Sequence, residues 1–407
     1  MAQVSPAVIQ GTCDPRFEAV RQEFERNFSQ RGEVGASVSV TVEGTTVVDL
    51  WGGFSDPESG RPWEKDTVVV VWSCTKGATA ICAHILVSRD ELDLEAPVAA
   101  YWPEFAQSGK DGIPVRMLLN HQAGLAALRK PLPPGAFYDW DLMTSALAAE
   151  APFWTPGLQH GYHGLTFGFL VGEVIRRVSG KSPGRFFKDE VADRLGIDFH
   201  IGLHESQEAR VSRCTLQPPP DPNNLTPAER QVFSDPTSVT FLMLANNGGY
   251  MMPGECDTRA AHAAEIPSAG GISNARGLAG LYAPIANGGG PLLDEGSVRR
   301  MGAVSSASGV DATLFLPTRF SLGFVKAIDN RRHPAGGDNS LILSEEAFGH
   351  SGLGGSIGFA DPRARMSFGY AMNKHGAGMG LNDRGQSLID AAYRSLGFTS
   401  DAFGTWA

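Results

Sequence analysis

A serine and a lysine three residues apart, Ser73 and Lys76, form the pair in this sequence best placed for nucleophilic chemistry. They follow an apolar run, residues 68–72, at the point where the pattern predicts a helix to begin. Because residues three apart share a helix face, the hydroxyl and the amine can meet in the first turn, where free backbone N–H groups favour developing negative charge. Apolar neighbours lower the pKa of a lysine and make its amine a usable base. Ser73 and Lys76 are therefore candidates for a nucleophile and its general base.

The more common hydrolase pattern, G-x-S-x-G, occurs twice, and neither copy has the setting of a nucleophile elbow. Residues 180–184 follow a predicted helix instead of a strand, and Pro183 removes a backbone N–H that an oxyanion hole would use. Residues 354–358 run into a predicted strand and turn, where the elbow requires a helix. We interpret the first as a linker between helices and both as products of a high glycine content.

Histidine pairs raise the question of a metal site. His160 and His163, or His200 and His204 with Glu205, could place two ligands on one face. No H-E-x-x-H pattern and no third-ligand pattern accompanies them. We therefore expect no metal and no other cofactor.

The cysteines are odd in number and widely spaced, and none forms a C-x-x-C pair. Neither a disulfide framework nor a zinc ribbon is indicated, so we expect free thiols in a reducing cytosol. We expect the thiol of Cys74, next to the candidate nucleophile, to pack in the core. The five are Cys13, Cys74, Cys82, Cys214 and Cys256.

Composition and charge limit the class of protein. The chain has 407 residues, of which 42% are hydrophobic and 19% charged, as in a globular protein with a large core. Its 49 glycines and 26 prolines predict many tight turns. A net charge of −10 without a basic run argues against nucleic acid and anionic membrane as partners. No signal-peptide pattern and no apolar run of about 18 residues occurs, so we expect a cytoplasmic protein without a membrane span.

The first ninety residues alternate between helix and strand patterns. Apolar residues at helical spacing predict a helix over 14–30. Alternating valines at 36–42 and a second run at 45–50, separated by Glu43-Gly44, predict a hairpin. The run at 68–72 then leads into a helix over 73–89.

The rest of the chain divides into a helical middle and a strand-rich end. Residues 91–290 read as helices broken by Pro and Gly, at 115–120, 139–150, 166–178 and 183–195, with a polar loop at 217–225. Strand patterns return at 320–327, 341–344, 356–360 and 365–372, and a final helix is predicted over 386–396.

This order predicts an α/β (α+β) fold. One mixed antiparallel sheet, built from both chain ends and flanked by helices, would carry an inserted all-helical domain, and the two termini would pack together on the sheet. The predicted units are residues 1–90 plus 291–407 and residues 91–290, with the active site at their junction.

Three further segments resemble motifs of class C β-lactamases and their relatives. Residues 155–168, which include Tyr162, resemble the segment with the catalytic tyrosine, and residues 115–125 resemble the stretch before it. Residues 349–355 resemble the strand that bears the Lys-Thr-Gly triad. With Ser73-x-x-Lys76, the four parts fall in the family's order over about 34–395. The resemblance implies the fold of serine β-lactamases and DD-peptidases, in the penicillin-binding-protein superfamily.

Two departures from the β-lactamase pattern concern the substrate. Gly164 stands where an asparagine follows the tyrosine by two places, and His350 replaces the first lysine of the triad. An imidazole is mostly neutral near pH 7, so both changes argue against an anionic amide or lactam. They resemble family VIII carboxylesterases, which mainly cleave esters. Many of those carry Trp-x-Gly at the third motif, which this chain lacks.

The resemblance implies a mechanism through an acyl-enzyme. Ser73 would attack the ester carbonyl while neutral Lys76 and Tyr162, as phenol or phenolate, relay its proton. The oxyanion would be held by the backbone N–H groups of Ser73 and Leu353. His350 would position substrate, support the Tyr162 region or serve as a structural histidine. The residues expected to border the substrate are His350, Ser351, Gly352 and Gly164.

The sequence therefore predicts a serine carboxylesterase that acts on a small short-chain ester. A β-lactamase, a D-amino acid peptidase or an acyltransferase of the same fold is the alternative, and a non-catalytic ligand-binding protein is the second. The intact trio of Ser73, Lys76 and Tyr162 argues against the second, and His350 with the absence of an export signal argues against a cell-wall substrate. Residues 217–247 are long and polar at their start, as in a lid over a pocket. No oligomeric state is specified.

Overall fold

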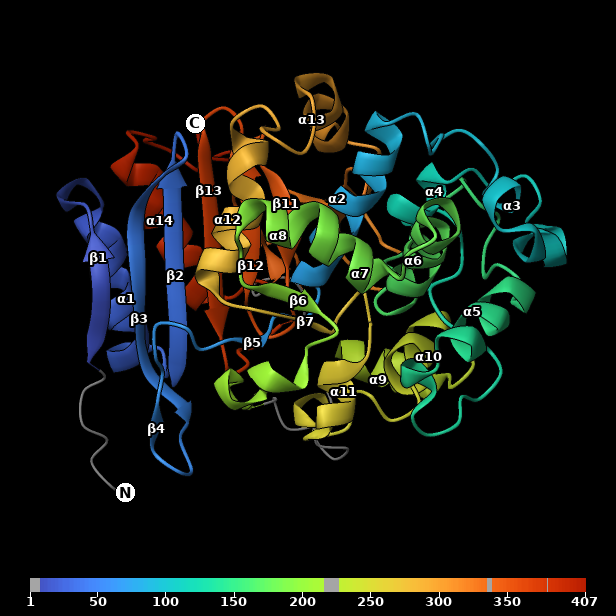
Figure 1. Cartoon of the computed structure of the whole chain (residues 1–407), viewed down its shortest axis with the longest axis horizontal. Coiled ribbons are helices and arrows are strands. Elements are labelled where there is room, and N and C mark those ends of the chain that lie inside the picture. The colour runs from blue at the N-terminus through green and yellow to red at the C-terminus, as the bar shows by residue number, and fades with distance from the viewer. Residues whose placement is uncertain (1–7, 216–226, 335–338, 379) are drawn as a thin grey trace.

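A large antiparallel sheet occupies one end of the molecule, and helices cover both its faces and extend beyond it (Figure 1). The structure is a computed structural model that describes residues 8–215, 227–334, 339–378 and 380–407. No helix among these residues is long and apolar enough to cross a membrane.

The sheet joins the two ends of the chain, as predicted. Its order is β1-β3-β2-β13-β12-β11-β10-β9-β8, with β4 paired to β3. The N-terminal and C-terminal strands meet where β2 pairs with β13, with Val38 opposite Tyr370. The strands are β1 (Ile9–Cys13), β2 (Gly35–Val42), β3 (Thr45–Asp56), β4 (Arg61–Pro62), β8 (Ser306–Ser308), β9 (Thr318–Phe320), β10 (Val325–Lys326), β11 (Phe348–Ser351), β12 (Ile357–Asp361) and β13 (Met366–Met372).

Successive residues of β13 point to opposite faces of the sheet, and different helices cover the two faces. Phe368 and Tyr370 enter a core shared with α1 (Glu18–Gln30) and α14 (Asp383–Ser395), which pack on each other, so the two termini share one face of the sheet. Gly369 faces the other way, and a Cβ there would lie 2.2 Å from the backbone oxygen of Ala275. The missing side chain lets α12 (Ala275–Ala286) lie directly on the sheet.

The long helix α2 (Cys74–Ser88) lies between strand β11 of the sheet and helices α6 and α7 (Figure 1). Its residues from Cys74 to Leu86 are all buried, and it packs on both α6 and β11. The remaining α-helices are α3 (Val98–Tyr101), α4 (Arg116–Leu119), α5 (Trp140–Ala149), α6 (Thr166–Ser179), α7 (Pro183–Phe187), α8 (Asp193–Leu195), α9 (Pro227–Ser234), α10 (Val239–Ala245), α11 (Arg259–Ala263) and α13 (Glu295–Gly302).

The predicted helical middle differs from the structure in two ways. Residues 91–290 contain strands β6 (Phe199–Ile201) and β7 (Gly271–Ser273), which form a small sheet with β5 (Val69–Val70). Strands this short have no room for an alternating pattern. The boundary at residue 290 also assigns α12 to the helical unit, whereas α12 packs on the large sheet.

Smaller differences have local causes. Strand β1 was not expected, because its three central residues are exposed at the sheet edge and show no alternation. Residues 341–344 were expected to form a strand and instead contribute only an isolated bridge from Leu341 to Ile328. The helix expected over 183–195 divides into α7, a π-helical turn at Lys188–Ala192 and α8. The predicted polar loop at 217–225 lies outside the described residues.

Candidate active site

Ser73 lies at the start of α2, directly after a strained residue. The backbone of Trp72 has a φ of +49°, a left-handed conformation that a bulky side chain rarely adopts. The indole packs against the rings of Tyr250 and His375, with centroids 6.0 Å and 5.5 Å away. Such strain persists only where surrounding contacts impose it. The turn that presents Ser73 is therefore held in place by the packing of Trp72.

Lys76 is fully buried, and its amine touches three oxygens. Nζ lies 2.9 Å from Ser73 Oγ, 2.7 Å from the carbonyl oxygen of Gly164 and 2.9 Å from that of Ser268. Burial lowers the pKa of Lys76 well below the ordinary 10.5. A neutral amine can donate its two N–H groups to the two carbonyls, which leaves its lone pair directed at the Ser73 hydroxyl. The arrangement therefore suits an amine that accepts a proton from Ser73.

Tyr162 lies in the segment between α5 and α6, and its side chain reaches Ser73. Its phenol donates a hydrogen bond to Ser73 Oγ at 2.9 Å. Burial raises the pKa of Tyr162 above the ordinary 10.0, so the group is a neutral phenol at pH 7. Lys76 Nζ also lies 4.9 Å from the centre of the tyrosine ring. The structure thus brings together the three side chains that the sequence singled out.

A buried carboxylate, Asp311, organises the loop that carries Tyr162. It accepts the backbone N–H of Tyr162 at 3.1 Å and 3.2 Å, one distance to each oxygen. It also accepts the hydroxyls of Thr313 and Thr318 and the N–H of Leu314. The sequence analysis missed Asp311, because it lies far from Tyr162 along the chain and belongs to no local motif.

His121 is a second group that positions Tyr162. Its backbone is left-handed, with a φ of +65°, and its ring packs between Tyr162 and Phe320 at 5.1 Å and 4.5 Å. His121 Nδ1 accepts the backbone N–H of His163 at 3.1 Å. Burial holds the pKa of His121 well below 6.5, so the imidazole is neutral. His121 lies in the segment 115–125 that resembles a family motif, but no role was predicted for it from the sequence.

Strand β11 brings the third motif alongside the Ser73 turn. The Cys74 thiol, which packs in the core as expected, donates to the backbone oxygen of His350 at 3.3 Å. A Cβ on Gly352 would lie 2.3 Å from the backbone oxygen of Val71, so only glycine fits there. The N–H groups of Ser73 and Leu353 donate no hydrogen bond within the described part of the chain. Both are therefore free to bind a ligand oxygen.

The predicted substrate-binding residues have different environments. His350 is 3% exposed, and its Nδ1 donates to the backbone oxygen of Ser351 at 2.7 Å. Burial and the nearby Lys76 lower the pKa of His350 to about 3, so the imidazole is neutral. Gly164 contributes its carbonyl to Lys76 and is not among the residues that line the adjoining cavity.

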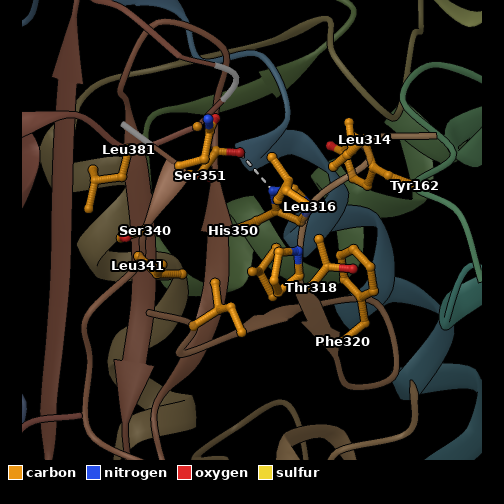
Figure 2. Close-up of a pocket in the computed structure, with 15 residues that line it drawn as sticks. Tyr162, Leu314, Leu316, Thr318, Phe320, Ser340, Leu341, His350, Ser351 and Leu381 are labelled. Atoms are coloured by element: carbon orange, nitrogen blue, oxygen red, sulfur yellow. Dashed lines mark hydrogen bonds between the residues drawn. The ribbon is translucent and has the colours of Figure 1, made fainter. Parts of the chain in front are cut away.

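A cavity of about 80 Å³ opens beside Tyr162, His350 and Ser351 (Figure 2). Figure 2 shows Tyr162 and Leu314 on one side of His350, and Leu341 and Leu381 on the other. No lysine or arginine lines the cavity among the described residues. Its apolar lining consists of Leu314, Leu316, Pro317, Phe320, Val325, Ile328, Leu341 and Leu381.

The alternative motifs are used structurally. Gly180 ends α6 and Ser182 caps α7, as expected for a linker between helices. Ser356 is buried directly before β12. Both G-x-S-x-G copies therefore lack the strand-to-helix turn of a nucleophile elbow.

Histidines of the two pairs form hydrogen bonds to other groups of the protein. His163 donates from Nδ1 to the backbone oxygen of Gly161 and accepts the N–H of Leu125 at Nε2. His160 bonds the hydroxyl of Thr318, and His200 bonds Asp198.

The predicted lid is described only in part. Residues 216–226 lie outside the described residues, and two residues of α10 lie beside segments of the site. Thr240 donates its hydroxyl to the backbone oxygen of Thr313, and Met243 contacts Gly164. That this region forms a lid stays a prediction.

Comparison with known proteins gives a consistent result. The family described as Beta-lactamase matches residues 21–392. The chain is 34% identical over 375 residues to the esterase/beta-lactamase LipL of Mycobacterium tuberculosis, covering 89% of this chain and 82% of that protein.

Two solved structures share the fold over nearly the whole chain. A family VIII carboxylesterase is 37% identical, with a TM-score of 0.83, over 95% of this chain and 100% of that one. A penicillin-binding protein homologue from Caulobacter crescentus is 35% identical, with a TM-score of 0.81, over the same two shares.

Proposed function

The chain belongs to the β-lactamase family and is a serine hydrolase, and on this premise we propose that it is a carboxylesterase that cleaves short-chain esters through an acyl-enzyme on Ser73. The observation that carries the proposal is the position of Ser73 Oγ, which lies 2.9 Å from both Lys76 Nζ and the Tyr162 phenol. One side chain can take the serine proton, and the other can supply a proton to the leaving group.

Acylation begins with Lys76 as the base. Ser73 Oγ attacks the ester carbonyl and its proton passes to the neutral amine, whose low pKa makes it available at pH 7. The carbonyls of Gly164 and Ser268 hold the amine in place before and after it gains the proton. The product of this step is a tetrahedral adduct with one negative oxygen and a Lys76 ammonium.

Tyr162 serves as the acid when the adduct collapses. The C–O bond to the alcohol breaks, the phenol protonates the departing oxygen, and the Lys76 ammonium returns a proton to Tyr162. A water then attacks the acyl carbonyl, and its proton passes through Lys76 and Tyr162 to Ser73 Oγ. Ser73 Oγ leaves as a hydroxyl and the free acid is released. Protons balance over the cycle, so no cofactor enters the scheme.

The N–H groups of Ser73 and Leu353 would hold the oxyanion. Each has no hydrogen-bond partner within the described part of the chain, and Gly352 allows the two segments to approach. Backbone donors of this kind each contribute about 10² to 10³ in rate.

The cavity supports an uncharged, short substrate. Apolar side chains line most of its volume of about 80 Å³, and the neutral His350 offers no cation to a substrate carboxylate. Gly164 has no side chain with which to contact a substrate amide. These features favour a small ester over a lactam or a D-amino acid peptide.

A pair of assays tests the proposal. We expect a p-nitrophenyl ester of a short acid to be hydrolysed much faster than a chromogenic cephalosporin. Ser73→Ala should abolish ester hydrolysis, whereas Ser182→Ala, a serine in a G-x-S-x-G copy, should retain it. Mass spectrometry of protein quenched during turnover should show the acyl group on the peptide that contains Ser73. Faster turnover of the cephalosporin, or full activity of Ser73→Ala, would overturn the assignment.

A further inference from the structure

Two cysteines and a carboxylate that are not among the proposed catalytic groups lie close together. The sulfur atoms of Cys214 and Cys256 and a carboxylate oxygen of Asp257 all lie within 4.8 Å of one another. No motif in the sequence indicates this cluster, because the two cysteines are far apart along the chain. Among the described residues, it is the one group of three metal-ligating side chains this close together.

The carboxylate of Asp257 is affected by the charges of Arg213 and His262 without forming a direct ion pair with either. Both of its oxygens lie 3.0 Å from the backbone N–H of Cys214, and it forms no ion pair with the residues that the structure describes. A partly buried carboxylate without a paired cation costs free energy, because its charged form loses hydration. The two thiols beside it must ionise in the same setting to ligate a metal. A bound cation would stabilise the ionised forms of these groups.

The donor set fits one class of ion. Thiolates with a carboxylate suit Zn²⁺ and other thiophilic divalent cations, whereas Mg²⁺ and Ca²⁺ prefer oxygen alone. Two sulfurs on a tetrahedral Zn²⁺ lie about 3.8 Å apart, so side chains already within 4.8 Å need only small rotations. We propose that Cys214, Cys256 and Asp257 bind a thiophilic divalent cation, Zn²⁺.

A cavity reaches Asp257, while Cys214 and Cys256 are not among the residues that line it. It measures about 340 Å³, and its lining includes Asp257 and His262. His262 Nδ1 lies 2.7 Å from Glu208, while its Nε2 is buried without a hydrogen-bond partner among the described residues. A water in the fourth position of the metal can donate to this nitrogen. The unpartnered imidazole nitrogen thus belongs to a residue that lines the same cavity as Asp257.

Binding must displace two protons. Both thiols lose their protons when they ligate, so one Zn²⁺ enters and two H⁺ leave, with no change in oxidation state. The site joins Cys214 to the 3₁₀ turn Glu255–Asp257. Two residues before Cys214, Ser212 donates its N–H at 2.7 Å to the backbone oxygen of Val68, which directly precedes β5. The metal would therefore tie two distant segments to the strand that leads to Ser73.

Metal titration of the full chain tests the proposal. Protein freed of metal with a chelator and kept reduced is titrated with CdCl₂, and the ultraviolet thiolate-to-metal band is recorded; ZnCl₂ is titrated by calorimetry. We expect one ion per chain, release of two protons and a higher melting temperature. Cys214→Ser and Cys256→Ser should lose the band, and Asp257→Asn should bind at least about tenfold more weakly.

Cys13→Ser is the matched control, because Cys13 lies on β1 away from the cluster and should leave binding unchanged. Circular dichroism checks that each variant is folded. The proposal fails if the reduced protein shows no thiolate band with Cd²⁺, if Cys214→Ser and Cys256→Ser keep it while folded, or if Cys13→Ser loses it.

Discussion

Lys76 Nζ lies 2.9 Å from Ser73 Oγ, and no carboxylate contacts the amine in the described part of the chain. Burial without a counter-ion favours the neutral amine, and two backbone carbonyls orient it. A lysine in an ion pair would stay protonated and could not accept the serine proton. The low charge of this pocket is therefore part of the proposed chemistry.

Loss of the base should reduce activity without loss of the fold. We expect Lys76→Met to lower kcat/KM for a short-chain ester by about 10² to 10⁴-fold, because the serine proton has no acceptor. Lys110, also fully buried, donates to the backbone oxygens of Gln107, Ala148 and Glu150. Lys110→Met should instead lower stability by about 1 to 3 kcal/mol and keep kcat. Equal loss of activity in both variants would count against Lys76 as the base.

The role of Tyr162 can be separated from that of Lys76 by the leaving group. Tyr162→Phe removes the proposed acid, so an ethyl ester should lose about 10² to 10³-fold in kcat. A p-nitrophenyl ester should lose clearly less, because p-nitrophenolate departs without a proton. Stopped-flow or steady-state rates with matched acyl groups give the ratio. An equal loss for both esters would remove the acid role from Tyr162.

Asp311 should act as a positioning residue. Asp311→Asn weakens its bonds to the Tyr162 loop, so kcat should fall by up to about 10²-fold while KM changes little. Asp361 is a matched buried carboxylate, which accepts the phenol of Tyr393 at 2.8 Å away from the site. Asp361→Asn should lower the melting temperature and leave kcat near the wild-type value. A purely structural role for Asp311 predicts the same behaviour in both variants.

The glycine of the third motif should resist any side chain. Gly352→Ala places a Cβ 2.3 Å from the backbone oxygen of Val71, so the adjoining Leu353 N–H must move. We expect kcat/KM to fall by about 10² to 10³-fold, the effect of losing one oxyanion donor. Gly112→Ala is the control, because nothing lies within 4 Å of its added Cβ. If the two variants hydrolyse the ester equally fast, Leu353 does not bind the oxyanion.

Buried histidines should make the protein sensitive to acid. Burial lowers the pKa of His84 and His375 to about 4 and that of His163 and His350 to about 3. Below the ordinary value of 6.5 the unfolded chain binds protons that the folded chain does not, so stability falls as pH drops from 6.5 towards 4. Each such group changes the slope by at most about 1.4 kcal/mol per pH unit. Urea unfolding at several pH values measures the slope, and His84→Asn should reduce it. A flat stability between pH 6.5 and 4 would contradict the expectation.

Local spacing in the sequence was enough to predict several elements. Residues three apart at a helix start had to face the same way, and Ser73 and Lys76 do so. The hairpin at Glu43-Gly44 and the antiparallel sheet formed from both chain ends follow from alternating patterns and turn residues. Short strands such as β6 and β7 were not predicted, because three residues are too few to show an alternating hydrophobic pattern.

The surroundings of the reactive side chains depend on the folded structure. Burial of Lys76, the anchoring of Tyr162 by Asp311 and the meeting of Cys214 with Cys256 all depend on contacts between distant parts of the chain. The order of residues along the chain is enough to show which side chains could react and how neighbours along a helix face one another. Desolvation and long-range hydrogen bonds set the protonation and position of those side chains, and they exist only once the chain has folded.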